Sequence, residues 1–429
     1  MIPLLFNSCT VTAGVFALRL TSLLETLELK AYDALTYFSQ YDALDERFLI
    51  IKVDDNDLKF QKEKYKYKGL SILSDPALKD LLKKLTTKYS PRVTGLDIYR
   101  TDSPDTNVEG LENLIVDTKN LITVCSHKSV GTQNPNPGQH PPPNVPNDRI
   151  SFVNVIEDNF ADDIVRRLWM VAGELAQSES PCRQQESEQL EAFSLVLALR
   201  YLAEEKKGKP QILYTPPDSK GGELSINNVI FERLGYFAGG YQNINAEGYE
   251  TLFRYRNVES DPQKIANIVS LKTFLTGIPA DQVNGKIVLI GGQTETQPDK
   301  WKTPLGDVPG IVLHAHMVSY ILDVAEGKRP EIRVLSVQYD FLWTWGWGLF
   351  GASIGFFLYH HRTTLPSLRK WTLNTLAFLV CTGLIGLWIS CWVLLQSAGI
   401  WIPFVPPTLS YSLSLIITPI RLWRNSKPK

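Results

Sequence analysis

The chain has 429 residues, of which 44 are basic, 45 are acidic and 44% are hydrophobic. Aromatic residues make up 10% of it, so it can bury a core and is not a disordered protein. Five cysteines do not make a disulfide-dense small domain, and a net charge of −1 excludes a global attraction to nucleic acid.

The chain begins with an apolar segment. Its first 18 residues, MIPLLFNSCTVTAGVFAL, are uncharged, and Arg19 is the only charge among the first 20. A membrane-crossing helix needs about 20 predominantly apolar residues, so this segment is just long enough. A cleaved signal peptide is the alternative, but a basic start and a small-residue cleavage site are missing. We therefore predict a retained transmembrane helix over 1–20, continued by a charged helical stretch.

Residues 21–337 are long enough for one large domain with its own core. The buried-strand pattern FLIIKV at 48–53 is followed by a helix that opens at Asp75 and Pro76, and then by the strand pattern RVTGLDIY at 92–99. This alternation predicts a βαβ unit with parallel strands. Further strands are predicted at 121–125, 150–158, 211–215, 252–256 and 286–292, and further helices at 191–207 and 314–327. The predicted fold class is α/β with a mixed, mostly parallel sheet.

One segment inside this domain has a distinct composition. Residues 131–149, GTQNPNPGQHPPPNVPNDR, are rich in proline and offer little to bury. This composition predicts an exposed loop, with a ligand for a proline-recognising module as the alternative.

Three long apolar runs follow the domain. Residues 339–359 contain a single charge, Asp340, and residues 371–395 and 400–420 contain none. Each run is long enough to cross the hydrocarbon layer. Eight of the ten tryptophans lie beyond residue 337 and cluster toward the ends of the runs, as in an interfacial belt. We predict transmembrane helices over 338–360, 371–395 and 400–420.

The charges are unevenly distributed along the chain. The last 92 residues carry seven basic residues and one acid, whereas residues 21–337 carry 36 basic and 44 acidic residues. The positive charges near the apolar runs fall in the connector 360–370 and in the tail 421–429, and cytoplasmic loops are the ones enriched in Lys and Arg. We therefore predict that 421–429 is a cytoplasmic tail and that 21–337 is extracytoplasmic.

Six segments carry a family resemblance. They are LELKAYDAL (27–35), FLIIKVDDNDL (48–58), VTGLDIYRTDSP (93–104), FVNVIEDNFADDIVRRL (152–168), GKIVLIGGQTETQPDKWKTPLGDVPGIVLHAHMVSYIL (285–322) and GIWIPFVPPTLSYSL (399–413). Together and in this order they resemble the CHASE type-2 domain, a sensory domain that is extracellular in bacterial cyclases and histidine kinases. The resemblance covers nearly the whole chain.

The resemblance implies a multi-pass protein of the bacterial inner membrane whose external domain senses an unknown small-molecule or ion ligand. Nine residues follow Ile420, too few for a kinase, cyclase or phosphodiesterase domain, so we expect a separate cytoplasmic signalling effector. The expected partners are the lipid bilayer, the ligand and this effector. A homodimer is left open, and neither nucleic acid nor a cofactor is expected.

A candidate ligand site follows from the predicted parallel sheet, because ligands bind beyond the carboxyl ends of such strands. Its residues are Asp54, Asp55, Asp97, Gly291, Gly292 and Gln293. Carboxylates can bind a cation or the donors of a ligand, and glycines allow close backbone approach. The alternative is that the acids cap helices and the glycines form turns.

Histidines and cysteines give weaker signals. His314 and His316 are the close histidine pair of the predicted domain, but at a helix start they point in different directions, which favours a structural role over a zinc site. Cys125 and Cys182 are the two cysteines predicted to lie outside, where an oxidising compartment permits a disulfide between them.

The sequence holds no GxSxG, P-loop or HExxH motif and no cysteine-based zinc spacing. We therefore expect a sensor rather than an enzyme. The alternatives are a structural or partner-docking membrane protein and a metal-dependent hydrolase that uses Asp54, Asp55 and Asp97.

Overall fold

The computed structural model describes residues 2–69, 71–128, 137–158, 162–173, 180–182, 190–205, 214–217, 222–242, 244, 248–295, 298–364 and 373–425. Part of the proline-rich segment (131–136), part of a predicted strand (211–213), most of the basic connector (365–370) and part of the basic tail (426–429) lie outside these ranges. The chain divides into a helical unit, Met1–Ser39 with Leu234–Asn245 and Ile332–Lys429, and an α/β unit, Gln40–Arg233 with Ala246–Glu331.

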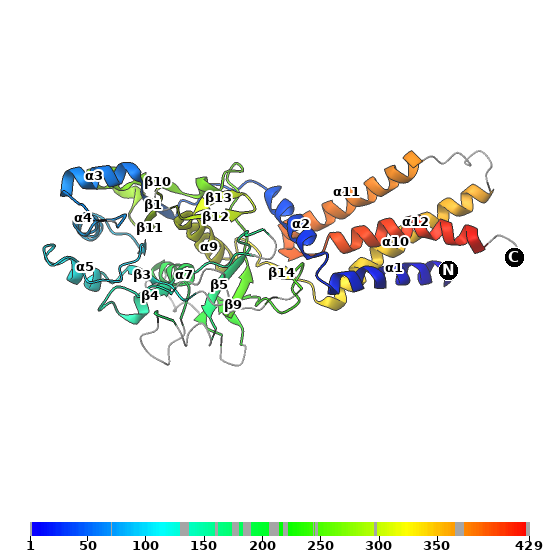
Figure 1. Cartoon of the computed structure of the whole chain (residues 1–429), viewed down its shortest axis with the longest axis horizontal. Coiled ribbons are helices and arrows are strands. Elements are labelled where there is room, and N and C mark those ends of the chain that lie inside the picture. The colour runs from blue at the N-terminus through cyan, green and yellow to red at the C-terminus, as the bar shows by residue number, and fades with distance from the viewer. Residues whose placement is uncertain are drawn as a thin grey trace. The chain divides into compact units, whose positions relative to one another are not determined.

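The α/β unit is built on a six-stranded sheet with the order β10-β1-β11-β2-β3-β4, in which every pairing is parallel (Figure 1). The strands are β1 (Phe48–Val53), β2 (Val93–Asp97), β3 (Leu121–Cys125), β4 (Ile150–Phe152), β10 (Asn267–Ser270) and β11 (Ile287–Gly292). Strands β1, β2, β3 and β11 are almost completely buried, as expected where helices cover both faces of a parallel sheet. The predicted α/β class is confirmed.

Helices pack on the sheet in two groups. One group contains α7 (Phe193–Glu205) and α9 (Gly310–Ala325), which contact each other and the central strands. The other contains α3 (Asp55–Tyr65), α4 (Asp75–Thr87), α5 (Leu111–Asp117) and α8 (Leu271–Thr276). In α4 the predicted leucine stripe is buried, because residues at helical spacing share the face that covers the sheet.

Antiparallel pairs form separate small sheets. They are β5 (Arg167–Ala172) with β9 (Gly248–Leu252), β6 (Tyr214–Thr215) with β7 (Leu224–Ile226) and β8 (Val229–Phe231), and β12 (Lys300–Thr303) with β13 (Gly306–Pro309). The strand predicted at 252–256 is wrong, because the strand ends at Leu252 and the apolar pattern beyond it comes from loop residues Phe253 and Tyr255, which are buried without strand pairing. The strand predicted at 150–158 ends at Phe152, and Asn154 instead bonds the backbone of His127 with its side chain.

A buried ion network ties the segment before β1 to the end of α9. Asp323 pairs with Arg47 at 2.6 Å, with Arg256 at 2.5 Å and with Arg329 at 2.9 Å. Arg329 also pairs with Asp42 at 2.5 Å. One carboxylate thus joins three arginines from separate parts of the chain.

Cys125, the last residue of β3, forms a disulfide with Cys182, and their Cα atoms lie 5.4 Å apart. The bond closes a loop with a sequence separation of 57 residues. It therefore anchors residues 180–182 to the end of β3.

The helical unit contains α1 (Ile2–Leu20), α2 (Glu25–Tyr37), α10 (Val337–Thr364), α11 (Leu373–Ala398) and α12 (Val405–Asn425), with a short pair of strands, β14 (Arg333–Val334) and β15 (Ile400–Trp401). Helices α1, α10 and α12 pack side by side (Figure 1). Gly351 makes this possible, since a Cβ there would lie 2.3 Å from the carbonyl oxygen of Tyr411. Small residues at such contacts are typical of membrane helices.

Two of the described helices are long and apolar enough to cross a membrane, Val337–His360 within α10 and Asn374–Ala398 within α11. Leu4–Leu20 and Glu25–Tyr37 qualify only together, as a pair bent by 93°. Helix α12 does not qualify by this measure, because it carries many hydroxyl side chains, among them Ser410, which hydrogen-bonds Thr12 of α1 at 2.7 Å. The expectation of apolar helices at the C-terminal end is confirmed, and the count of four spans stays a prediction.

Candidate functional site

The six predicted site residues come together at the carboxyl edge of the sheet. Asp97 at the end of β2 lies opposite Gly291 in β11, and Val53 at the end of β1 lies opposite Gly292. Asp54, Asp55 and Gln293 follow these strand ends directly. From the sequence we expected parallel strands to bring these residues to one edge of the sheet, and they lie there.

At this edge the aspartates after β1 have structural contacts. Asp54 is the N-cap of α3 and accepts the backbone N–H groups of Asn56 and Asp57 at 3.0 and 3.1 Å. Asp55 accepts the backbone N–H of Glu295 at 3.0 Å, and the N–H of Gln293 donates to the Val53 carbonyl at 2.9 Å. The first of these two contacts ties the segment after β11 to the start of α3, and the second ties it to the end of β1. The role of Asp54 is the one that the helix-capping alternative anticipates.

The two glycines allow close packing. A Cβ on Gly291 would lie 2.6 Å from the Cβ of Ile311 in α9, and a Cβ on Gly292 would lie 2.4 Å from Cδ1 of Ile72. Gly291 has no room for a larger side chain, and at Gly292 the end of the Ile72 side chain would have to shift. Close packing of α9 and of the loop before α4 therefore explains both glycines.

Asp97 has an acidic neighbour that the sequence did not reveal. Burial and the nearby Asp299 raise the pKa of Asp97 well above its usual range. Burial also raises the pKa of Asp299, although the Trp301 indole donates to its carboxylate at 2.7 Å. Asp299 lies against Gly310, the first residue of α9, where a Cβ would come within 2.1 Å of Oδ2. The edge thus holds a close pair of carboxyl groups that favour protonation.

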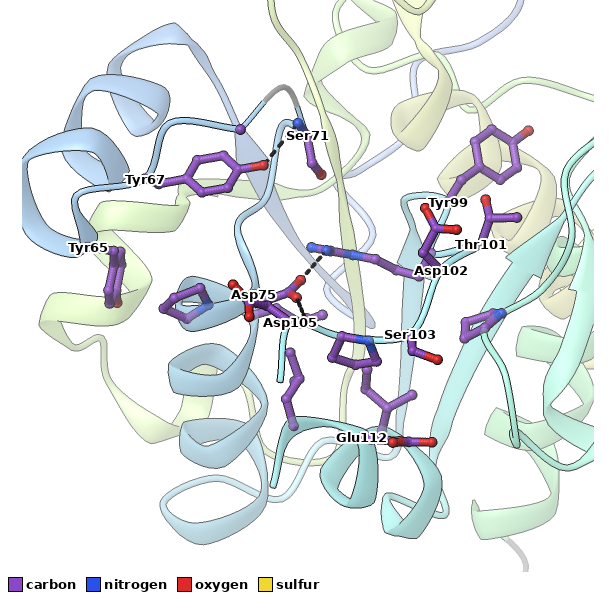
Figure 2. Close-up of a pocket in the computed structure, with 18 of the residues that line it drawn as sticks. Tyr65, Tyr67, Ser71, Asp75, Tyr99, Thr101, Asp102, Ser103, Asp105 and Glu112 are labelled. Atoms are coloured by element: carbon purple, nitrogen blue, oxygen red, sulfur yellow. Dashed lines mark hydrogen bonds and ion pairs between the residues drawn. The ribbon is translucent and has the colours of Figure 1, made fainter. Parts of the chain in front are cut away.

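A cavity of about 630 Å³ opens beside this edge. Its walls are the end of α3 with the residues after it (65–69 and 71), the start of α4, the loop after β2 (99–105), α5 and the prolines 142–143. Figure 2 shows Tyr65 and Tyr67 on one side of it, and Tyr99, Thr101 and Asp102 on the other. None of the six predicted residues lines it.

An ion pair organises the cavity. Arg100 bonds Asp75 through Nη1 at 2.6 Å and also donates to the carbonyl of Leu73. The other oxygen of Asp75 accepts the backbone N–H of Asp105 at 2.7 Å, as Figure 2 shows. Burial lowers the pKa of Arg100, and its Nε is buried without a hydrogen-bond partner in the described part of the chain. The pair fixes the loop after β2 against α4.

The rest of the lining combines aromatic rings with charges of both signs. Lys66 and Lys68 face the cavity together with the acids Asp102 and Glu112. Burial, with the nearby Asp97 charge adding to it, raises the pKa of Tyr99 to about 12, so its hydroxyl is a hydrogen-bond donor at neutral pH. A few polar groups around an apolar base of leucine and proline are typical of a site for a small polar molecule.

Two sequence signals point to this cavity in retrospect. Tyr99 and Arg100 follow Asp97 by two and three residues within the segment VTGLDIYRTDSP, and lysine and tyrosine alternate in the segment after α3. Neither signal shows that the two segments meet. Their sequence separation of some 30 residues is bridged only by the βαβ crossover.

The histidine pair is part of the core. His316 is buried, with Nε2 2.8 Å from the Pro262 carbonyl and Nδ1 accepting the Arg256 N–H at 3.2 Å. Burial lowers the pKa of His314 and of His316 to about 4. Among the described residues, no group of three His, Cys, Asp or Glu side chains could hold a metal ion.

A second cavity, of about 560 Å³, lies beside the edge strand β10 and includes Asp42, Gln263 and Ile268 in its lining. Its strand, β10, is separated from β2 by β1 and β11 in the strand order. A substitution in this second cavity can serve as a control for substitutions in the cavity beside β2.

Residues 10–353 match the protein family described as the CHASE2 domain. No curated protein and no solved structure matches the chain.

Proposed function

The chain belongs to the CHASE2 family, a family of extracellular sensory domains, and we propose that it is a membrane-anchored sensor of a small polar molecule or ion. The ligand occupies the cavity beside β2, and the signal passes through the membrane helices to a separate cytoplasmic effector. The protein belongs to the bacterial inner membrane, with the α/β unit outside and the C-terminus in the cytoplasm.

The observation that carries this proposal is the position of the cavity. It opens outside the carboxyl ends of parallel strands, where open α/β sheets bind their ligands. The Arg100–Asp75 pair gives it a fixed polar wall, and Tyr99 and Asp102 add groups that can recognise a ligand. A ligand that binds one arrangement of this wall more tightly than another would favour one state of the domain.

Contacts of the first helix support its retention in the mature protein. Arg19 pairs with Asp340 of α10 at 2.6 Å, and both side chains are buried. Asn7 accepts from Arg421 of α12 at 2.6 Å. A segment removed as a signal peptide would leave these partners without contacts, so these contacts favour α1 as a lasting part of the bundle.

The alternative of a metal-dependent hydrolase receives little support. Asp54 and Asp55 already accept backbone N–H groups, and Asp97 shares its surroundings with another carboxyl group, Asp299. The alternative of a partner-docking protein remains distinguishable by experiment, because a docking protein needs no small ligand.

The test uses the full chain in lipid nanodiscs. Thermal midpoints are measured with a panel of amino acids, organic acids, sugars and divalent cations. A compound that raises the midpoint of the wild type should lose its effect in the double variant Tyr99→Ala/Asp102→Ala. It should keep its effect in Gln263→Ala, which alters the second cavity.

Two outcomes oppose the proposal. A compound that acts equally on the wild type and on Tyr99→Ala/Asp102→Ala binds elsewhere. Silence of the whole panel, together with a partner captured by crosslinking whatever ligand is present, favours the docking alternative.

A further inference from the structure

Helix α2 exposes apolar side chains and keeps two acids on its buried side, where they lie among Leu29, Tyr32 and Leu35. Its exposed side carries Leu27 and, at its flanks, Leu23 and Phe38, whose exposed fractions are 54%, 67% and 62%. Its buried side carries Glu25 and Glu28. A helix between protein and water normally turns its acids outward and its leucines inward. The outward face of α2 is therefore suited to a solvent other than water.

The buried acids are fully used by the helical unit. The two oxygens of Glu28 accept the backbone N–H groups of Phe404 and Val405 at 2.8 and 2.7 Å. Val405 is the first residue of α12, so Glu28 of α2 caps the N-terminus of a helix that lies far away in the sequence. Glu25 accepts the backbone N–H of Gln242 at 3.2 Å. These bonds fix the rotation of α2 and keep its apolar side turned outward.

The contacts of α2 also fix its level along the bundle. It follows α1 at a bend of 93°, so it runs across the direction of the first apolar helix. The Phe38 carbonyl at its far end accepts from the indole Nε1 of Trp392 at 2.8 Å, and Trp392 lies in the last two turns of α11. Glu28 in its middle meets the start of α12. All three places are ends of helices in the helical unit: the end of α1, the last turns of α11 and the start of α12.

We propose that α2 is an interfacial helix that lies in the plane of the membrane, with Leu23, Leu27 and Phe38 in contact with lipid. Helices that lie on a bilayer bury an apolar face at the boundary between headgroups and acyl chains. The ends of membrane-spanning helices define that level, and α2 is bonded to three of them. Lys30 is exposed beside the apolar face, and its flexible stem can carry the ammonium group to the lipid phosphates.

The occupant of this face is lipid rather than a second copy of the chain. The bend of 93° lays the axis of α2 along the bilayer plane when α1 stands upright, and its bonds to helix ends hold it at the boundary between headgroups and acyl chains. Because Glu28 caps α12, a change in the depth of α2 is passed directly to α12. The outward face of α2 thus couples the state of the lipid bilayer to the helices that follow the α/β unit in the sequence.

The test places a photoreactive p-benzoylphenylalanine at position 27, in place of Leu27, in the full chain. The protein is reconstituted in nanodiscs of phosphatidylcholine and phosphatidylglycerol, irradiated and analysed by mass spectrometry. Phospholipid adducts at position 27 are the expected result, and the same probe at position 38 should also give them. This design leaves every native cysteine and every buried contact of α2 in place.

The matched control places the probe at position 230 in β8, where Ile230 is an apolar side chain of the α/β unit with an exposed fraction of 39%. It should give no lipid adduct. Adducts to a second copy at position 27, or lipid adducts no more abundant at positions 27 and 38 than at position 230, would overturn the proposal. Neither outcome depends on the ligand of the external domain, so this test and that of the proposed function can fail separately.

Discussion

The two units bury charge in different ways. In the α/β unit Asp323 contacts three arginines, and Arg166 and Arg167 share Asp158 while Arg167 also bonds Glu250 at 2.6 Å. In the helical unit Arg19 forms an ion pair with Asp340. Nη1 of this arginine and Oδ1 of this aspartate are buried and have no hydrogen-bond partner in the described ranges.

The difference reflects the solvent around each unit. A domain in water can surround a buried charge with partners drawn from a chain rich in charged residues. A bundle of apolar helices offers few partners, and a charge inside it is costly unless it is paired. The helical unit also exposes large apolar side chains, as expected of helices in lipid. Examples are Phe350 and Phe357 of α10, with exposed fractions of 51% and 57%.

The largest expected effect is on the network of the α/β unit. Asp323→Ala removes the buried carboxylate that three partly buried guanidinium groups share and should lower the free energy of unfolding by about 3–5 kcal/mol. Thermal or denaturant unfolding of the full chain measures this. Glu259→Ala, which removes an exposed partner of Lys264, is the control and should change little. Equal effects of the two variants would show that the network adds no stability.

The next effect concerns the helical unit. Asp340→Ala removes the ion-pair partner of the buried Arg19 and should destabilise the bundle by about 2.5–3.5 kcal/mol. The double variant Arg19→Ala/Asp340→Ala should recover much of this loss, because no unpaired charge remains. Thermal midpoints in nanodiscs for Arg19→Ala, Asp340→Ala and the double variant give the coupling energy between the two side chains. Additive losses would contradict a direct pairing of the two side chains.

The smallest effect concerns the carboxyl edge. Because the folded state raises the pKa of Asp97 above its usual value near 3.8, the folded chain holds a proton that the unfolded chain releases. The contribution of Asp97 to stability should therefore fall as the pH rises from the unfolded pKa through the folded pKa. Asp97→Asn removes this loss and should stabilise the protein at neutral pH by about 1.4 kcal/mol for each unit by which the pKa is raised.

Unfolding midpoints between about pH 4 and pH 8 test this, since that range starts near the usual pKa of an aspartate. Asp117→Asn, which changes an exposed acid at the end of α5, is the control. If Asp97→Asn and the wild type lose stability in parallel as the pH rises, Asp97 is not the group that titrates.

Local pattern was sufficient for the main elements of the domain. The apolar run at 48–53 and the leucines of α4 reveal a buried strand and a covering helix, because the period of burial equals the period of the backbone. The meeting of Asp54, Asp97 and Gly291 was also predictable, since parallel strands end at one edge. The strand at 252–256 was mispredicted, because buried loop residues imitate a strand pattern.

The sequence by itself determined that this chain has an acidic α/β domain between apolar helices, because composition and period are properties of neighbouring residues. It marked Arg19 and Asp340 as the single charges of their segments, but only the tertiary structure decided that they pair with each other. The same holds for the cavity, where Tyr67, Asp75 and Arg100 come from separate segments. It holds also for the outward face of α2, because rotation about a helix axis is set by partners such as Glu28 and Val405, which are 377 residues apart.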